Sequence, residues 1–329
     1  MRNRWFLPLV AGAYLLAVPA VAQELSGRLV VFNAGSLAAP FRDLLREFQR
    51  RNPAVDGIQE SSGSLEAARK LTELGRIPDV IGVADYHVIP SLLVPRHAGW
   101  YAGFARNAMV LAYTDRSAGA REITAANWWR ILLRPGVRVG RSDPVLDPNG
   151  YRTLMVYQLA EEHYREAGLA ARLAAASPPR FMRPKEADLV ALLQAGELDY
   201  AWSYRSIATT VGLRHVSLPP EVDLSDPARA EWYSRSAVRL PGSPRTGTDS
   251  VEFRGEPIVY GLTIPRTAAN PAAARALIRF LFSGEGQAIL RRNGFVLLEG
   301  TMLGGPEPPP ADVFSLRASP SSPEPRAKP

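Results

Sequence analysis

Cysteine is absent from all 329 residues of the chain. A chain without cysteine has no disulfide framework, no thiolate nucleophile and no cysteine ligand for a metal or an iron-sulfur cluster. It also lacks the cysteine to which a lipid anchor would be attached after an exported leader. Histidine is scarce as well, and the histidines at 87, 97, 163 and 215 are scattered. We therefore expect no resident cofactor.

Motifs of several enzyme classes are also missing. The chain has no Gly-x-Ser-x-Gly nucleophile elbow, no phosphate loop ending in Gly-Lys-Ser/Thr, no dinucleotide-binding glycine pattern and no His-Glu-x-x-His. We therefore expect a protein that is not an enzyme. An exported serine hydrolase that uses Ser36 or Ser64 stays open as an alternative, because such a site needs only a base within hydrogen-bond reach.

Charged residues are spread along the chain rather than concentrated in blocks. There are 39 Lys and Arg against 32 Asp and Glu, an excess of seven, and a leader containing two of the arginines would reduce it to five. Nucleic-acid binding needs basic residues clustered on one face, so we do not expect nucleic acid as a partner. The small positive excess gives a weak attraction for anions.

The first 22 residues have the pattern of a secretory signal peptide. In "MRNRWFLPLVAGAYLLAVPAVA", two arginines precede an apolar run that ends in Ala-Val-Ala, a typical cleavage site. Two prolines interrupt the run, whereas a membrane-spanning helix needs roughly 20 predominantly apolar residues. We expect export to the periplasm, cleavage after Ala22 and a mature protein without a membrane anchor.

Beyond the leader, apolar β-rich runs alternate with segments of helical periodicity. Residues 28–35 (RLVVFNAG) predict a strand, and the same order of strand and helix follows in "GIQESSGSLEAARKLTELG" and "PDVIGVADYHVIPSLLVP". This alternation predicts the α/β class, with mainly parallel sheets covered by helices. The mature length suffices for two such domains. From Gly300 onward the chain is rich in proline and serine, which predicts a disordered tail over 300–329.

Several polar residues stand at the ends of predicted elements. Ser36, Ser64, Asp147 and Glu186 each lie where a helix should begin, and Tyr204 follows a strand. In an open α/β sheet the ligand crevice lies outside the carboxyl ends of the strands, where these segments would meet. Each residue also has a simpler interpretation, since Ser and Asp are preferred helix caps and the helix dipole favours an acid in the first turn. Both interpretations stay open at this point.

In their order, these segments resemble the periplasmic tungstate- and molybdate-binding proteins of ABC importers, in the branch close to the archaeal tungstate binders. The resemblance rests on "VVFNAGSLAAPF", "ESSGSLEAARKLTELG", "SDPVLDPNGYRTLMV", "RPKEADLVALLQAGELDYAWSYRSIA" and "GEPIVYGLTIP". It extends over nearly all of residues 28–295.

The resemblance implies a type II periplasmic binding protein, in which two α/β domains joined by crossing strands close on a ligand in the cleft between them. Domain I would comprise residues 24–106 plus 266–299, and domain II residues 107–265. The protein would be a monomer that captures tungstate or molybdate. It would deliver the oxyanion to an inner-membrane permease and its ATPase.

The resemblance also implies roles for individual residues. In the family, hydroxyl and backbone N–H groups hold the oxygens of the oxyanion, and in this branch an Asp and a Glu approach the metal atom itself. The carboxylates would be Asp147 and Glu186. The groups holding the oxygens would be Gly35, Ser36, Ser64 and Tyr204.

A carboxylate at an anion site needs a physical explanation. Two unit charges 4 Å apart repel by roughly 4 kcal/mol at an effective dielectric constant near 20, so bare carboxylates, unless protonated, would weaken the binding of sulfate or phosphate. Tungsten and molybdenum are large d⁰ centres that accept further oxygen ligands. We therefore predict that Asp147 and Glu186 each donate an oxygen to the metal and repel sulfate and phosphate. A binding protein for another oxyanion, sulfate- or phosphate-like, remains an alternative.

Overall fold

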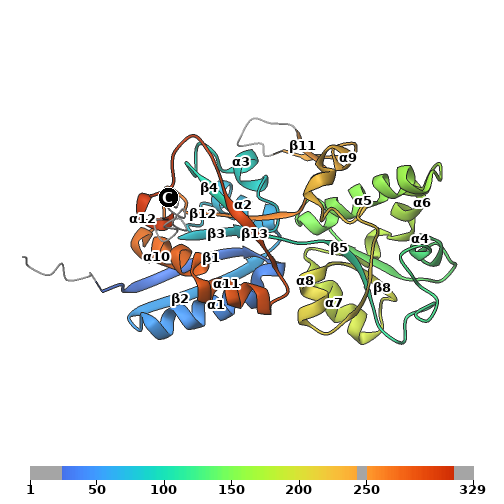
Figure 1. Ribbon diagram of the computed structural model, residues 1–329, viewed down its shortest axis with the longest axis horizontal. Helices are drawn as coiled ribbons and strands as arrows, with labels where there is room; N and C mark the ends of the chain where they lie inside the picture. The colour runs from blue at the N-terminus through green and yellow to red at the C-terminus, as the bar shows by residue number, and fades with distance from the viewer. Residues whose placement is uncertain (1–23, 243–249, 315–329) are drawn as a thin grey trace, which may run out of the picture.

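The computed structural model describes residues 24–242 and 250–314. The predicted signal peptide, residues 1–22, and the last part of the predicted tail, 315–329, lie outside the described residues. Two helix-covered sheets lie side by side along the long axis of the molecule (Figure 1). The α/β class predicted from the alternating pattern is confirmed.

The first sheet has six strands in the order β13-β4-β12-β3-β1-β2. Strand β1 pairs in parallel with β2 and β3, whereas β12 runs antiparallel to β3 and β4, and β13 antiparallel to β4. The strands are β1 (Gly27–Ala34), β2 (Val55–Ser62), β3 (Val80–Val83), β4 (Tyr101–Arg106), β12 (Val259–Thr263) and β13 (Val296–Gly304).

The second sheet has five strands in the order β7-β6-β8-β5-β9. Strand β6 is parallel to β7 and β8, whereas β5 is antiparallel to β8 and β9. Both sheets are thus mixed rather than mainly parallel, because β5 and β12, the strands that follow the two crossings, run against their neighbours. The strands are β5 (Met109–Tyr113), β6 (Val139–Ser142), β7 (Met182–Arg183), β8 (Tyr200–Tyr204) and β9 (Arg214–Ser217).

Two segments of the described chain connect the sheets. The first, Asn107 and Ala108, joins β4 to β5, and the second, residues 255–258, leads to β12 from β11 (Ser250–Arg254), which pairs with β10 (Ala237–Pro241). The N–H of Asn107 donates to the carbonyl of Ile258 (3.3 Å), so the two crossing segments are bonded to each other. Because β12 lies in the first sheet, the predicted end of domain II at residue 265 is wrong. We call residues 24–106 and 259–314 the first lobe, and 109–254 the second lobe.

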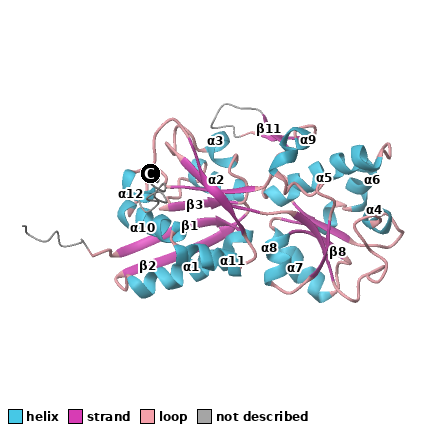
Figure 2. Cartoon of the chain, in the orientation of Figure 1, coloured by secondary structure: helices cyan, strands magenta, loops and turns pink. Residues whose placement is uncertain are grey.

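Helices lie outside the sheets in both lobes (Figure 2). The first lobe has a 3₁₀ helix, η1 (Gly35–Leu37), and the helices α1 (Ala38–Arg51), α2 (Ser64–Thr72), α3 (Val88–Leu92), α10 (Pro271–Phe282), α11 (Gly284–Arg292) and α12 (Ala311–Phe314). The second has α4 (Trp128–Leu132), α5 (Pro148–Tyr164), α6 (Leu169–Ala176), α7 (Glu186–Ala195), α8 (Arg205–Thr210) and α9 (Ala230–Tyr233).

The strands at the centre of the second sheet are covered on both faces. Every residue of β5 and β8 is buried. Val110 and Ala112 pack with Leu189 of α7 in one apolar cluster, whereas Leu111 belongs to the main core on the opposite face. Because successive side chains of a strand point to opposite faces, a strand buried on both sides reads as a continuous apolar run.

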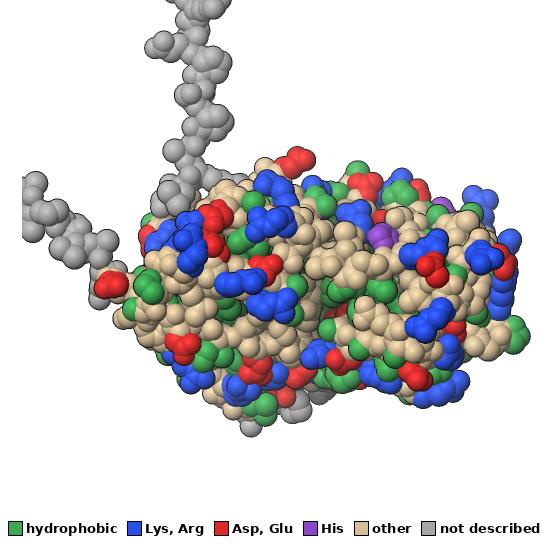
Figure 3. Space-filling view, turned by 90° about the horizontal axis from the view of Figure 1, so that it is seen from below, with side chains coloured by type: hydrophobic (Ala, Val, Ile, Leu, Met, Phe, Trp, Pro, Cys, Tyr) green, Lys and Arg blue, Asp and Glu red, His purple; other side chains and the backbone are tan. Residues whose placement is uncertain are grey.

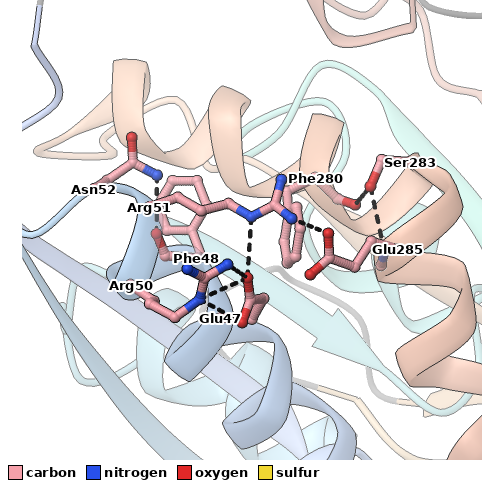
Figure 4. Close-up of polar contacts among 9 residues, drawn as sticks. Glu47, Phe48, Arg50, Arg51, Asn52, Phe280, Ser283 and Glu285 are labelled. Atoms are coloured by element: carbon pink, nitrogen blue, oxygen red, sulfur yellow. Dashed lines mark hydrogen bonds and ion pairs between the residues drawn. The ribbon is translucent and has the colours of Figure 1, made fainter.

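Helix α1 is held by its buried face and by contacts at its C-terminal end. Its buried residues, among them Phe41, Leu44, Leu45 and Phe48, follow helical spacing. At its end, the Arg51 guanidinium lies 5.0 Å from the centre of the Phe280 ring and pairs with Glu47 and Glu285 (Figure 4). Ser283 caps the neighbouring helix α11 by accepting the N–H of Gly286 (3.2 Å). These contacts hold α1, which follows directly on η1.

The predicted disorder of residues 300–329 is wrong as far as Phe314. Strand β13 continues beside β4 to Gly304, and α12 packs on α10. Val313 is only 1% exposed, and the ring of Phe314 contacts those of Trp100 and Phe282, with centroids 6.1 and 5.1 Å apart. A short apolar pair inside a proline-rich stretch therefore anchors this segment.

The surface carries charges of both signs. On the face shown in Figure 3, Lys and Arg side chains are interspersed with Asp and Glu over both lobes. Of the helices in residues 24–242 and 250–314, none combines the length and the apolar character needed to cross a membrane.

Candidate functional site

The predicted site residues come from both lobes and converge where the lobes meet. Gly35, Ser36 and Ser64 belong to the first lobe, where η1 follows β1 and α2 follows β2. The others open α5 and α7 or end β8 in the second lobe. All of the side chains are buried, with exposed fractions of 6% for Ser36, 0% for Ser64, 4% for Asp147, 1% for Glu186 and 0% for Tyr204.

Asp147 is a helix cap and also a link between two helices. Its Oδ1 accepts the N–H of Asn149 (3.0 Å), with Pro148 in the first turn, as expected of a cap on α5. Its Oδ2 accepts the N–H of Glu186 (3.0 Å) at the start of α7. The cap interpretation is therefore correct but incomplete, since the same carboxyl group binds the two helix starts together.

Glu186 is held by one of its two carboxyl oxygens. Oε1 accepts the N–H of Tyr204 (2.6 Å) and the hydroxyl of Ser203. Oε2 is buried and has no hydrogen-bond partner among the described residues. Buried polar atoms are seldom left unpaired in folded proteins, so this oxygen is an exception within the described residues.

Burial disfavours the charged forms of both carboxyl groups. It raises the pKa of Asp147 to about 6, although the N–H groups of Asn149 and Glu186 oppose the rise. Burial raises the pKa of Glu186 well above its ordinary value, and the nearby charge of Asp147 raises it further. Two buried carboxyl groups thus lie close enough for the charge of one to raise the pKa of the other.

The first lobe contributes hydroxyl groups and a glycine. Ser36 Oγ accepts a hydrogen bond from the Tyr260 hydroxyl (3.0 Å), and Ser64 Oγ accepts the N–H of Ala84 (2.9 Å). Each serine has one proton left to donate. A Cβ on Gly35 would lie 3.7 Å from Cβ of Lys185, the residue before α7, so η1 faces the start of that helix.

Arg152 is a site residue that the sequence analysis missed. It lies on α5 and is 2% exposed, and its Nη1 donates to the carbonyl of Ala84 (2.6 Å) and to the Tyr204 hydroxyl (3.0 Å). Its Nη2 lies 3.3 Å from Oδ2 of Asp85 in the first lobe. The sequence offered a clue to Arg152, because it lies in the same "DPNGYR" stretch as the helix cap Asp147. The positive charge of Arg152 opposes the rise in the pKa of Asp147.

Two further residues reach the site, Asn107 from the first crossing segment and Tyr260 from β12. Asn107 donates to the hydroxyl of Tyr260 (3.2 Å), which in turn donates to Ser36. Sequence reasoning missed both, because Tyr260 reads as one more apolar position of a buried strand and Asn107 as a turn residue.

The hydrogen bonds of the two serines include no general base among the described residues. In the part of the chain that the structure describes, neither Ser36 nor Ser64 is hydrogen-bonded to a histidine or a carboxylate. Within the same ranges, no three acidic or histidine side chains are grouped so that they could hold a metal ion on their own. The site is therefore a set of donors, two carboxyl groups and one guanidinium.

Two cavities lie near the junction of the lobes. One, of about 240 Å³, adjoins Gly35 and Ser36 and is lined from the other side by α7 and α8. A larger one, of about 610 Å³, is lined by Arg106 and Glu256 and touches none of the predicted site residues. We assign the site to the polar convergence beside the smaller cavity, because the larger cavity has no such convergence.

Solved structures with the same fold include two oxyanion-binding proteins. The periplasmic molybdate-binding protein of Azotobacter vinelandii aligns with a TM-score of 0.59 at 16% identity, covering 82% of this chain and 100% of its own. The sulfate-binding protein SubI of Mycobacterium tuberculosis aligns with a TM-score of 0.59 at 14% identity, covering 88% and 89%. These likenesses confirm the predicted architecture of a two-domain periplasmic binding protein.

Relatives at higher identity are solute-binding proteins. One from Petrotoga mobilis, uncharacterised, is 43% identical over 281 residues, which is 85% of this chain and 87% of its own length. The molybdate/tungstate-binding protein WtpA of Pyrococcus abyssi is 36% identical over 294 residues, 82% of this chain and 84% of its own length. The family model for bacterial extracellular solute-binding proteins matches residues 29–296. The chain therefore belongs to the bacterial extracellular solute-binding protein family.

Proposed function

We propose that this protein binds tungstate or molybdate between its lobes, with Asp147 and Glu186 as oxygen ligands of the metal atom. The single observation that carries the proposal is the unpartnered, buried Oε2 of Glu186 beside the carboxyl group of Asp147. A sulfate site would be lined by donors alone, because ionised carboxylates repel a dianion. A d⁰ metal centre accepts a carboxylate oxygen, which satisfies the orphan atom.

The donors of the first lobe complete the site. Ser36 and Ser64 each keep one proton that can be donated, and the backbone of Gly35 approaches the start of α7. These groups, with the hydroxyl of Tyr204, would hold the oxyanion's own oxygens. Oxygen ligands from two carboxylates would raise the coordination of the metal from four towards six. The name of the Pyrococcus relative supports the choice of ligand.

Binding would be coupled to closure and transport. Groups from both lobes meet at one small ion, so ligand binding favours the closed arrangement of the two lobes. As an exported monomer in the periplasm, the protein would present the bound oxyanion to an inner-membrane permease with its ATPase. The oxyanion is cargo in this scheme, and the protein needs no cofactor and performs no chemical reaction. Small-angle scattering should show a smaller radius of gyration with tungstate than without it.

Calorimetric titration with tungstate, molybdate and sulfate tests the proposal. Asp147→Ala and Glu186→Ala should each lose about tenfold or more in tungstate and molybdate affinity and gain affinity for sulfate. Asp79→Asn is a matched control, since Asp79 is a buried acid of the first lobe that binds the N–H groups of Val30 and Asn270 far from the site. Wild-type affinity in both alanine variants, with no gain for sulfate, would overturn the proposal.

Experiments on the purified wild-type protein and its variants also distinguish tungstate or molybdate binding from the two alternatives, a general oxyanion binder and a hydrolase. Excess sulfate or phosphate that displaces bound tungstate from the wild-type protein would favour a general oxyanion binder. X-ray absorption of the tungstate complex counts the oxygens around the metal. Four short W–O distances without any longer ones would exclude the carboxylate ligands even if tungstate binds. Turnover of an ester or phosphate ester that is lost in Ser36→Ala or Ser64→Ala would favour a hydrolase.

A further inference from the structure

A chain of hydrogen bonds runs from the crossing segments to Ser36, and the direction of each bond can be assigned. The side-chain Oδ1 of Asn107 accepts the N–H groups of Ala108 (3.0 Å) and Ser206 (3.2 Å). Two backbone donors identify this atom as the oxygen, because an amide nitrogen cannot accept them. The Nδ2 group of Asn107 must therefore face the other way.

The orientation of Asn107 sets the next bond. Nδ2 donates to Ser206 Oγ (2.7 Å) and to the hydroxyl oxygen of Tyr260 (3.2 Å). A hydroxyl that accepts from Asn107 has its own proton free for a different partner, and the acceptor within reach is Ser36 Oγ (3.0 Å). The proton of the Tyr260–Ser36 bond thus belongs to the tyrosine.

The surroundings of Tyr260 keep its hydroxyl in place and protonated, so that it remains the donor to Ser36. It is fully buried, and its ring packs against those of Phe295 and Tyr204, with centroids 5.0 and 5.8 Å away. Burial raises the pKa of Tyr260, so the hydroxyl stays protonated. Ser36 is also buried and accepts the hydrogen bond from Tyr260. Its own hydroxyl proton must therefore be donated to a partner other than Tyr260.

We propose that Asn107 and Tyr260 are positioning residues that fix the Ser36 hydroxyl as a donor toward the bound ligand. The inference rests on the proposed function, because it assigns the direction of a hydrogen bond to the oxyanion. Asn107 belongs to the first crossing segment, and Tyr260 lies in β12 directly after the second. The donor is therefore oriented by one side chain of the first crossing segment and one of the strand after the second, before any ligand arrives, and a ligand atom at this position must be an acceptor.

A double-mutant cycle tests this relay, by which we mean the hydrogen bonds from Asn107 to Tyr260 and from Tyr260 to Ser36. Tyr260→Phe keeps the ring and removes the hydroxyl, and it should weaken tungstate or molybdate binding by about tenfold in calorimetric titration. The same substitution in a Ser36→Ala background should change affinity by less than about twofold, because its effect acts through Ser36. An equal loss in both backgrounds, or no loss in either, would overturn the inference.

Tyr157→Phe is the matched control. Tyr157 is an equally buried tyrosine, but its hydroxyl binds Ser177 (3.1 Å) and Trp202 (2.8 Å) inside the second lobe. It should lose stability to a similar degree as Tyr260→Phe and keep wild-type affinity. A loss of affinity as large as that of Tyr260→Phe would show that any missing buried hydroxyl weakens binding, which would also overturn the relay.

Neutron diffraction from deuterated, ligand-free crystals provides a second readout that does not depend on the ligand. The deuteron between Tyr260 and Ser36 should lie on the tyrosine oxygen. Its presence on the serine oxygen would overturn the inference whatever the protein binds. If the wild-type protein binds neither tungstate nor molybdate, the proposed function fails, while the neutron map still decides how Ser36 is oriented.

Discussion

Arg152 and Asp85 form a buried ion pair between the two lobes, with Nη2 of the arginine 3.3 Å from Oδ2 of the aspartate. Their side chains are 2% and 5% exposed. The neighbouring Tyr151 hydroxyl donates to the same carboxylate oxygen, and Arg152 also donates to the carbonyl of Ala84 (2.6 Å). The first turns of α5 are thus bonded to Ala84 and Asp85, which directly follow β3.

Asp85→Asn should weaken the closed arrangement of the lobes. Removing one partner of a buried ion pair costs about 3–5 kcal/mol when the remaining charge stays buried, and the Arg152 side chain is 2% exposed with the lobes together. Tungstate affinity should fall by about tenfold or more, mainly because the ligand leaves faster. Stopped-flow measurement of tungstate release checks the rate. A release rate equal to that of the wild type would contradict a role for this pair in holding the lobes together.

The matched control for this change is Asp199→Asn. Asp199 pairs with Arg138 (3.0 Å), but both residues belong to the second lobe. This variant should lose stability while the release rate stays within about twofold of the wild type. Faster release in both variants would indicate that lost stability, rather than the contact between the lobes, controls release.

Gly63→Ala should block closure by steric contact. A Cβ at Gly63 would lie 2.0 Å from the carbonyl oxygen of Leu146 in the second lobe. The backbone of Gly63 is extended (φ −65°, ψ 150°), which alanine adopts without strain once the lobes are apart. Tungstate affinity should therefore fall by about a hundredfold or more, with little change in the stability of the ligand-free protein. Titration calorimetry and urea unfolding measure the two quantities.

Gly284→Ala is the corresponding control. Gly284 begins α11, and a Cβ there would have no atom within 4 Å. Its affinity for tungstate should equal that of the wild type. If Gly63→Ala also binds as the wild type does, the lobes do not need the contact between Gly63 and Leu146 when they close on the ligand.

Local patterns explain why much of the fold could be predicted. Helix starts such as Asp147-Pro148 and Asn270-Pro271 follow from capping chemistry within a few residues, and both are observed. The periodicity of α1 and the apolar run of β5 follow from which faces are buried. Capping patterns also located candidate site residues, because helix starts gather at the carboxyl ends of strands, where a ligand crevice lies.

The features that escaped prediction depend on contacts between distant parts of the chain. Tyr260 donates to Ser36, 224 positions away, and Arg152 donates to Ala84, 68 positions away. Nothing in the local sequence distinguishes a tyrosine that fills a core from one that also orients a hydroxyl. The ordered segment up to Phe314 was missed for a related reason. Its high proline content predicted disorder, and nothing local showed that the apolar pair Val313 and Phe314 packs against the first lobe.

Phe314→Ala should lower the free energy of unfolding by about 2 kcal/mol. Complete truncation of a buried Phe costs roughly 3–5 kcal/mol, and Phe314 is only partly buried between Trp100 and Phe282. Leu74→Ala is the control, because Leu74 is 70% exposed and its loss should change stability by less than about 0.5 kcal/mol. Urea unfolding of both variants checks this, and equal values would mean that α12 does not stabilise the first lobe.

The ligand-free protein should lose stability as the pH rises from about 4 to about 6 because of Asp147. Burial raises the pKa of this carboxyl group from 3.8 to about 6. Between those values the folded state keeps a proton that the unfolded state releases, so the contribution of Asp147 is fully present below pH 3.8 and is lost by about pH 6. A shift of this size corresponds to at most about 3 kcal/mol. Glu186, whose pKa is also raised, extends the loss to higher pH.

Comparison of the wild type with Asp147→Asn isolates this effect from the other titrating groups. The stability of the variant relative to the wild type should rise between pH 4 and about 6, because the amide cannot ionise. Asp199→Asn should show the opposite trend: although burial raises its pKa, hydrogen bonds from Arg138 lower the pKa of Asp199 overall, so its contribution is present at neutral pH and lost on acidification. Urea unfolding at half-unit pH steps measures both differences. A difference between wild type and Asp147→Asn that does not vary with pH would show that Asp147 ionises normally in the ligand-free site.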